Sequence, residues 1–136
     1  MIECHVLEHS IDNMTEEDFD AVDNIIKAFD QALESGTQVE NWSNLNYQLH
    51  AALYKAADLP QAKEIIESLN LKSDRYIRLQ LLLTSRIDIA ENEHSELLNL
   101  CRKRDKVAAC ALLKSHILEA GQAIHDLLIK QQENAL

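Results

Sequence analysis

The stretch "LNYQLHAALYKAADLP", residues 45–60, decides the fold class of this chain. Its leucines recur every fourth residue, the spacing of an apolar stripe on one face of an α-helix: Leu45, Leu49 and Leu53. Asn46 and His50 border that stripe one turn apart, and Pro60 predicts a break in the helix. We therefore expect a helix that begins at about residue 39 or 42 and ends near Ala57.

The rest of the chain is also predicted to be helical. Only two glycines and one proline interrupt its 136 residues, and the β-branched and aromatic clusters typical of sheets are missing. Apolar residues at helical spacing predict further helices over residues 1–12, 15–36, 61–85, 87–104 and 105–131. The segment 69–74 is a candidate kink, so one long or two short helices are compatible with residues 61–85. We expect an all-α antiparallel bundle of about six helices.

Charge and cysteine content exclude several classes of function. The chain carries 23 acidic and 13 basic side chains, a net charge of −10. Phosphate binding needs a dense basic patch, so direct contact of these residues with DNA is not expected. Three cysteines without C-x-x-C spacing predict neither a disulfide framework nor a thiolate zinc site, which favours a reducing cytoplasm. No apolar run approaches the roughly 20 residues that span a bilayer, so no membrane contact is expected.

Six histidines differ in their place on the predicted helices. His94 and His116 fall within the apolar stripes of their helices, and His50 borders its own stripe, so these three are expected to point inward. The others are expected at the surface or at an edge: His5, His9 and His125. A single inward histidine is ordinarily a core residue hydrogen-bonded to a polar neighbour. Three in one small bundle, if their helices are adjacent, favour a shared divalent cation, which neutral imidazole binds well.

Polar residues extend this candidate metal site. Asn46 lies one turn before His50 on the same helical face and could supply a side-chain oxygen as a fourth ligand. Three nitrogens and one oxygen would leave positions open for water or for a ligand carboxylate, unlike a closed structural zinc site. Of Arg75, Arg78 and Arg86, we expect one to enter the cavity and bind such a carboxylate, and Arg78 is our candidate.

Three segments resemble one protein family. "NYQLHAALYKAADLP", residues 46–60, resembles the family's Asp/Asn-x-x-Phe-His block, which an alanine-rich turn follows. "ENEHSELLNLCRKRD", residues 91–105, resembles its Glu-His-x-x-Ile/Leu-Leu stretch, and "AACALLKSHI", residues 108–117, resembles its closing histidine segment. From about Leu7 to Leu128 the chain is thus similar to the all-helical C-terminal effector-binding domain, called FCD, of GntR-type bacterial transcription regulators of the FadR subfamily.

The resemblance implies a function and a set of site residues. Asn46, His50, His94 and His116 would bind a divalent metal, Zn²⁺ or Ni²⁺, which helps to hold a small organic acid effector. The domain would not be an enzyme, and it would form a homodimer that binds DNA through a winged helix-turn-helix domain that residues 1–136 lack. Because the chain opens within a helix, we expect one domain of a truncated protein. Many metal-binding members carry Asp at the position of Asn46, so the site is expected to be weaker here.

Two other classes of function remain open. A metal-dependent helical-bundle enzyme, either a mononuclear hydrolase or a di-iron protein, is suggested by Glu91-x-x-His94, which matches one element of a ferritin-like site. Such a site needs a second element of this kind and two further inward glutamates, which we do not find in the sequence. A helical interaction module without a small ligand would use the histidines only as core residues.

Overall fold

The computed structural model describes residues 1–83 and 86–135, and every regular element in this part of the chain is helical. The elements follow one another as α1 (Ile2–Asn13), α2 (Glu16–Ser35), the short 3-10 helix η1 (Val39–Asn41), α3 (Trp42–Tyr54), α4 (Pro60–Leu83), α5 (Ile87–Arg102) and α6 (Lys106–Ala135). The predicted all-α fold is confirmed. The expected end of the fourth helix near Ser85 lies outside the described residues.

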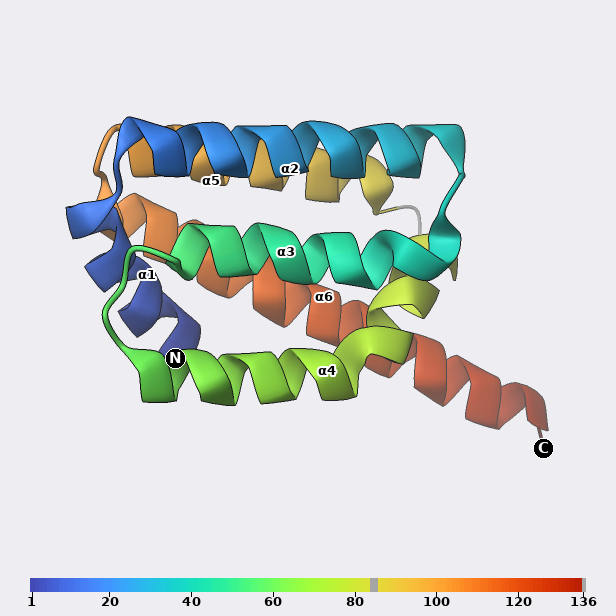
Figure 1. Ribbon diagram of the computed structural model, residues 1–136. Helices are drawn as coiled ribbons and strands as arrows, with labels where there is room; N and C mark the ends of the chain where they lie inside the picture. The colour runs from blue at the N-terminus through green and yellow to red at the C-terminus, as the bar shows by residue number, and fades with distance from the viewer. Residues whose placement is uncertain (84–85, 136) are drawn as a thin grey trace.

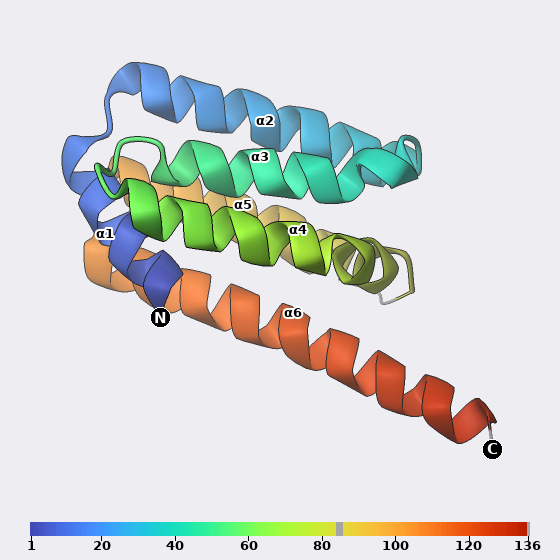
Figure 2. The same ribbon diagram turned by 60° about the horizontal axis from the view of Figure 1, so that its bottom comes forward.

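Consecutive long helices run antiparallel, as Figure 1 shows for α2 to α6. α2 packs on α3 and α5, and α6 packs on α5 and α4. The short helix α1 closes one end of the bundle against α3, α4 and α6. α6 crosses the bundle obliquely, and its C-terminal part extends beyond the other helices (Figure 2). None of the described helices is both long and apolar enough to cross a bilayer.

Local signals in the sequence account for the ends of α2. The Thr15 side chain accepts a hydrogen bond from the Asp18 backbone N–H, and the Asp18 carboxylate accepts one from the Thr15 backbone, which completes a capping box. At the other end Gly36 adopts a left-handed conformation with φ 66°, which glycine reaches without a steric penalty. Both ends agree with the boundaries predicted from the sequence.

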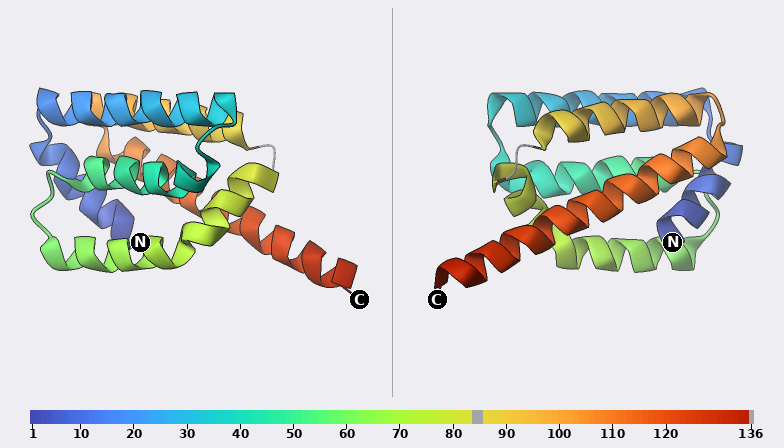
Figure 3. Two further views of the ribbon diagram at one scale, coloured as in Figure 1. Left: turned by 45° about the vertical axis from the view of Figure 1, so that its right-hand side comes forward. Right: turned by 180° about the vertical axis from the view of Figure 1, so that it is seen from behind.

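α4 is one helix rather than two. Its axis changes direction in its second half, which is visible in the left panel of Figure 3. Within the predicted kink at residues 69–74, the Ser73 hydroxyl donates a hydrogen bond of 2.9 Å to the Leu69 carbonyl oxygen. This kind of bond from a serine to the preceding turn often accompanies a bend in a helix.

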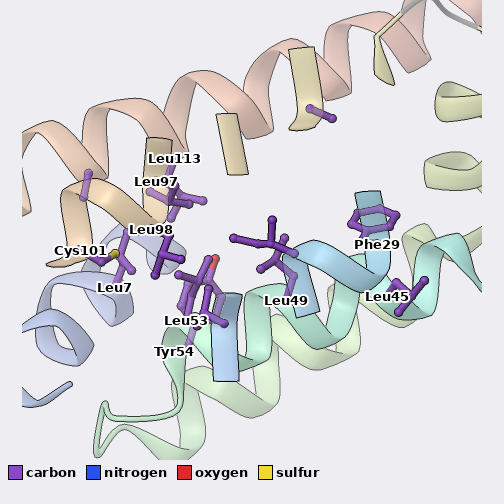
Figure 4. Packing of buried hydrophobic residues seen from close by; sticks show 14 of the residues in the cluster. Leu7, Phe29, Leu45, Leu49, Leu53, Tyr54, Leu97, Leu98, Cys101 and Leu113 are labelled. Carbon is purple, nitrogen blue, oxygen red and sulfur yellow. The ribbon is translucent and has the colours of Figure 1, made fainter. Parts of the chain in front are cut away.

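The apolar stripe of α3 lies at the centre of the core. Leu45, Leu49 and Leu53 follow one another along this helix in Figure 4, and each is buried. Phe29 from α2 and Leu97 from α5 belong to the same buried cluster. Asn46 borders this stripe, and it lines the interior cavity described below.

Contacts between α1 and α6 position the start of the chain. The Cys4 thiol donates to the Cys110 carbonyl oxygen at 3.5 Å, and the Cys110 thiol donates to the Cys4 carbonyl oxygen at 3.4 Å. All three cysteines are free thiols, and Cys101 is fully buried in the core. The reciprocal contact holds Glu3, the neighbour of Cys4, at the edge of the interior cavity.

Candidate metal centre

Three helices bring three histidines together. His50 comes from α3, His94 from α5 and His116 from α6, and one ring nitrogen of each lies within 4.8 Å of the others. The centroids of the rings are 5.1 Å apart for His94 and His116, 5.8 Å for His50 and His116, and 6.2 Å for His50 and His94. His50 and His94 are buried, and the His116 side chain is 14% exposed. This arrangement suits a single cation shared by three imidazoles.

Hydrogen bonds outside the cluster select the tautomers of two histidines. The Tyr54 hydroxyl donates to Oε1 of Glu3 at 2.9 Å, so it is free to accept a hydrogen bond from Nδ1 of His50, 3.4 Å away. Nδ1 of His116 lies 3.3 Å from Oε1 of Glu93. An ionised carboxylate can accept hydrogen bonds but cannot donate them, so Nδ1 of His116 is the donor. Both rings then carry their proton on Nδ1 and leave the lone pair of Nε2 free. Metal-bound histidines are commonly oriented in this way.

His94 has no such partner. Both of its ring nitrogens are buried without a hydrogen bond, although its ring packs on Phe29 with the centroids 5.6 Å apart. A buried polar group without a partner is costly, so a native protein rarely retains one without a use. A cation between the three rings would satisfy one of these nitrogens.

Burial keeps the imidazoles of His50 and His94 neutral by lowering the pKa of each. It lowers the pKa of His50 to about 3, with a smaller contribution from the charge of His116. Burial also lowers the pKa of His94 well below its usual value, and the charges of His116 and His50 act in the same direction. The neutral form is the one that donates a lone pair to a metal. The pKa of Glu3 is raised overall, because burial raises it by more than the hydrogen bond from Tyr54 and the charge of His116 lower it.

The histidines line a cavity of about 380 Å³, which is large enough for a small organic molecule. Asn46 lines the same cavity and is half-buried, so it lies in reach of the site from the face of α3 that carries His50. Arg78 does not line it: its guanidinium contacts Asp74 and donates to the Ser43 hydroxyl at 3.3 Å. Arg86 lines the cavity instead, and it forms an ion pair of 3.3 Å with Glu119.

Sequence reasoning missed the residues that support the histidines. Tyr54 follows His50 by four residues on the same helical face, so this partner was detectable from spacing. Glu93 precedes His94 in the sequence but bonds to His116 on another helix. Glu3 is 51 residues from Tyr54, and no local pattern connects the two.

The structure gives no support to a di-iron site. In residues 1–83 and 86–135, the three histidines form the one group of three or more ligand side chains close enough to share an ion. Glu91 is outside that group and does not line the cavity. Its pKa is raised by burial first and then by the neighbouring acids Asp30, Glu34 and Asp88, which places it in an acidic cluster on the α2 side of α5.

Fold and site together define a class: an all-helical domain with an internal cavity and a cluster of imidazoles at its wall. The chain belongs to the FCD domain family, whose family model matches residues 1–119. The family predicted from the three sequence segments is thereby confirmed.

The fold is similar to that of a solved structure, the crystal structure of a transcriptional regulator, a GntR family member, from Pseudomonas syringae pv. tomato. The two chains superpose with a TM-score of 0.79 at 22% sequence identity, and the alignment covers 95% of this chain and 53% of the regulator. This chain therefore spans about half the length of that regulator. No curated protein matches the sequence.

Proposed function

We propose that this chain is the ligand-sensing domain of a GntR-type transcription regulator, in which a divalent metal binds the carboxylate of a small organic acid. His50, His94 and His116 would hold the ion, which we expect to be Zn²⁺ or Ni²⁺. The observation that carries the proposal is the convergence of three imidazoles whose nitrogens lie within 4.8 Å of one another. Membership of the FCD domain family supports the regulatory role.

The remaining polar groups of the cavity have separate roles in this proposal. The side-chain oxygen of Asn46 would be a fourth, neutral ligand, which adds no negative charge to the ion. Of the predicted arginines, Arg86 lines the cavity and Arg78 does not, and the guanidinium of Arg86 is paired there with Glu119. The ion itself supplies a charged, exchangeable binding position for a carboxylate.

Transmission to DNA needs a difference between two conformations. An effector shifts an equilibrium only if it binds one conformation better than the other. Its cavity is bordered by α3, α4, α5 and α6, so a ligand there contacts helices from both sides of the bundle. In the whole protein, a homodimer of such domains would set the spacing of two N-terminal DNA-binding domains.

Metal analysis tests the proposal directly. Protein prepared without a histidine tag is analysed for bound metal by mass spectrometry and is then titrated calorimetrically with a panel of small organic acids. We expect one equivalent of metal in the wild type and in the control His125→Ala, which changes an exposed histidine of α6. His94→Ala should lose the metal. If His94→Ala retains the wild-type metal content and no acid binds, the sensor proposal is wrong.

A second variant pair tests whether the hydrogen bond between Glu93 and His116 strengthens metal binding. Glu93→Gln removes the charge that orients His116, and Glu96→Gln removes an exposed charge from the same helix. Loss of the hydrogen-bond partner of a metal-bound histidine typically weakens metal binding about 10–100-fold. We expect this loss for Glu93→Gln and wild-type affinity for Glu96→Gln, measured by competition with a chelating dye. Equal affinity of the two variants contradicts the assigned role of Glu93.

A further inference from the structure

Much of the cavity wall beyond the histidines is aliphatic, and α4 and α6 supply these side chains: Leu69, Ile77, Leu81, Ile117, Ala120 and Ile124. α4 also contributes three uncharged polar residues to the lining, Asn70, Ser73 and Gln80. On α6, the aliphatic positions follow His116 by one, four and eight residues, so the apolar surface continues for about two turns beyond the metal ligand. A ligand anchored at the histidines would therefore lay its body against aliphatic side chains of both helices.

The charges around the cavity limit how acidic that ligand can be. Arg86 is the one lysine or arginine side chain among the described residues that line it, and Glu119 already pairs with it. Glu3 and Glu93 line the same cavity and bring two carboxyl groups next to the metal centre. The ligand's first carboxylate would contact the ion directly, and the two glutamates add negative charge around it. A second carboxylate further along the ligand would meet no unpaired cation among the lining residues. Burial of an unpaired carboxylate is strongly unfavourable.

We propose that the ligand of this site is a monocarboxylate with an aliphatic body of about four to eight carbons, rather than a dicarboxylate or tricarboxylate. Its carboxylate binds the metal, and its chain lies between α4 and α6 along Ile77, Ile117 and Ile124. The inference rests on the proposed function, because it needs a metal at the histidines. It specifies the class of effector from the lining residues of this chain.

A chain-length series tests the aliphatic part of the inference. The protein is loaded with Co²⁺, whose visible absorption reports the ligands of the metal, and is titrated with acetate, butyrate, hexanoate and octanoate. Burial of each methylene should tighten binding by up to about fourfold. Ile124→Ser should reduce this gain for hexanoate but not affect acetate, whereas Leu128→Ser, one turn further on an exposed position outside the lining, should change neither.

Adipate tests the charge argument, because it differs from hexanoate only by a second carboxylate. We expect it to bind at least about 100-fold more weakly than hexanoate. Adipate binding as tight as hexanoate, or affinities that do not change with chain length, overturn this inference while the metal site stands. If the histidines take up no Co²⁺, the proposed function itself is refuted and this inference with it.

Discussion

Replacement of His94 by leucine is expected to stabilise the metal-free protein. His94 is 3% exposed, and both of its ring nitrogens lack a hydrogen-bond partner. An unsatisfied buried polar group costs about 1–3 kcal/mol, whereas a hydrophobic swap of similar volume beside Phe29 costs less than about 1.5 kcal/mol. The central values of these two ranges leave a net gain in unfolding free energy of about 1–2 kcal/mol. For a chain of this length, that gain raises the melting temperature by about 3–6 °C.

Added metal should make the wild type more stable than His94→Leu. An ion present at one hundred times its dissociation constant stabilises the wild type by about 2.7 kcal/mol, and it cannot stabilise a variant that lacks the site. Thermal unfolding followed by circular dichroism, with a chelator and then with Zn²⁺ or Ni²⁺, measures both effects. His125→Leu is the control at an exposed histidine and should behave as the wild type. Lower stability of His94→Leu in the chelator, or a metal response equal to that of the wild type, would refute the reasoning.

Further predictions concern pH and the outer residues of the site. The metal-free protein should lose stability in acid, because the unfolded chain takes up a proton near the ordinary histidine pKa of 6.5 whereas the pKa of buried His50 is about 3. The contribution of His50 to the free energy of unfolding, measured in urea, should fall by about 2–3 kcal/mol between pH 6.5 and 4.5. Asp30→Asn should stabilise the protein at pH 8 and have little effect at pH 3.5. Burial and the charge of Glu34 raise the pKa of Asp30 to about 6, so its ionisation in the native state costs stability as the pH rises. The urea midpoints of the wild type and the variant at the two pH values check this. Asn46→Asp should tighten metal binding in a chelator competition by restoring a negative charge, and an unchanged affinity would argue against contact of residue 46 with the ion. Tyr54→Phe should weaken metal binding about tenfold in the same assay, because His50 loses its outer partner.

The helices of this fold could be predicted because their signals are local. The stripe of leucines on α3, the capping box at Thr15 and the left-handed Gly36 all depend on residues within one or two turns. The kink of α4 was predicted from the same kind of information. Burial of His50 and His94 likewise agrees with their place against apolar stripes.

The candidate site was predictable only in part. Helical faces showed that three histidines point inward, but they could not show which arginine reaches the cavity. Arg78 and Arg86 both had plausible positions in the sequence, and the choice between them depends on where Asp74 and Glu119 lie. The support of His50 by Glu3 was not predictable, because it crosses from α1 to α3 through Tyr54.

The sequence by itself determined the helical fold class, the helix boundaries to within about one turn and the inward faces, because helical periodicity and capping are interactions between residues a few positions apart. Only the tertiary structure decided that residues from α3, α5 and α6 meet within a few ångströms beside one cavity, and which charged groups surround them. Those distances follow from the packing of whole helices against one another. That packing depends on the shape of the entire core, and no short stretch of sequence contains it.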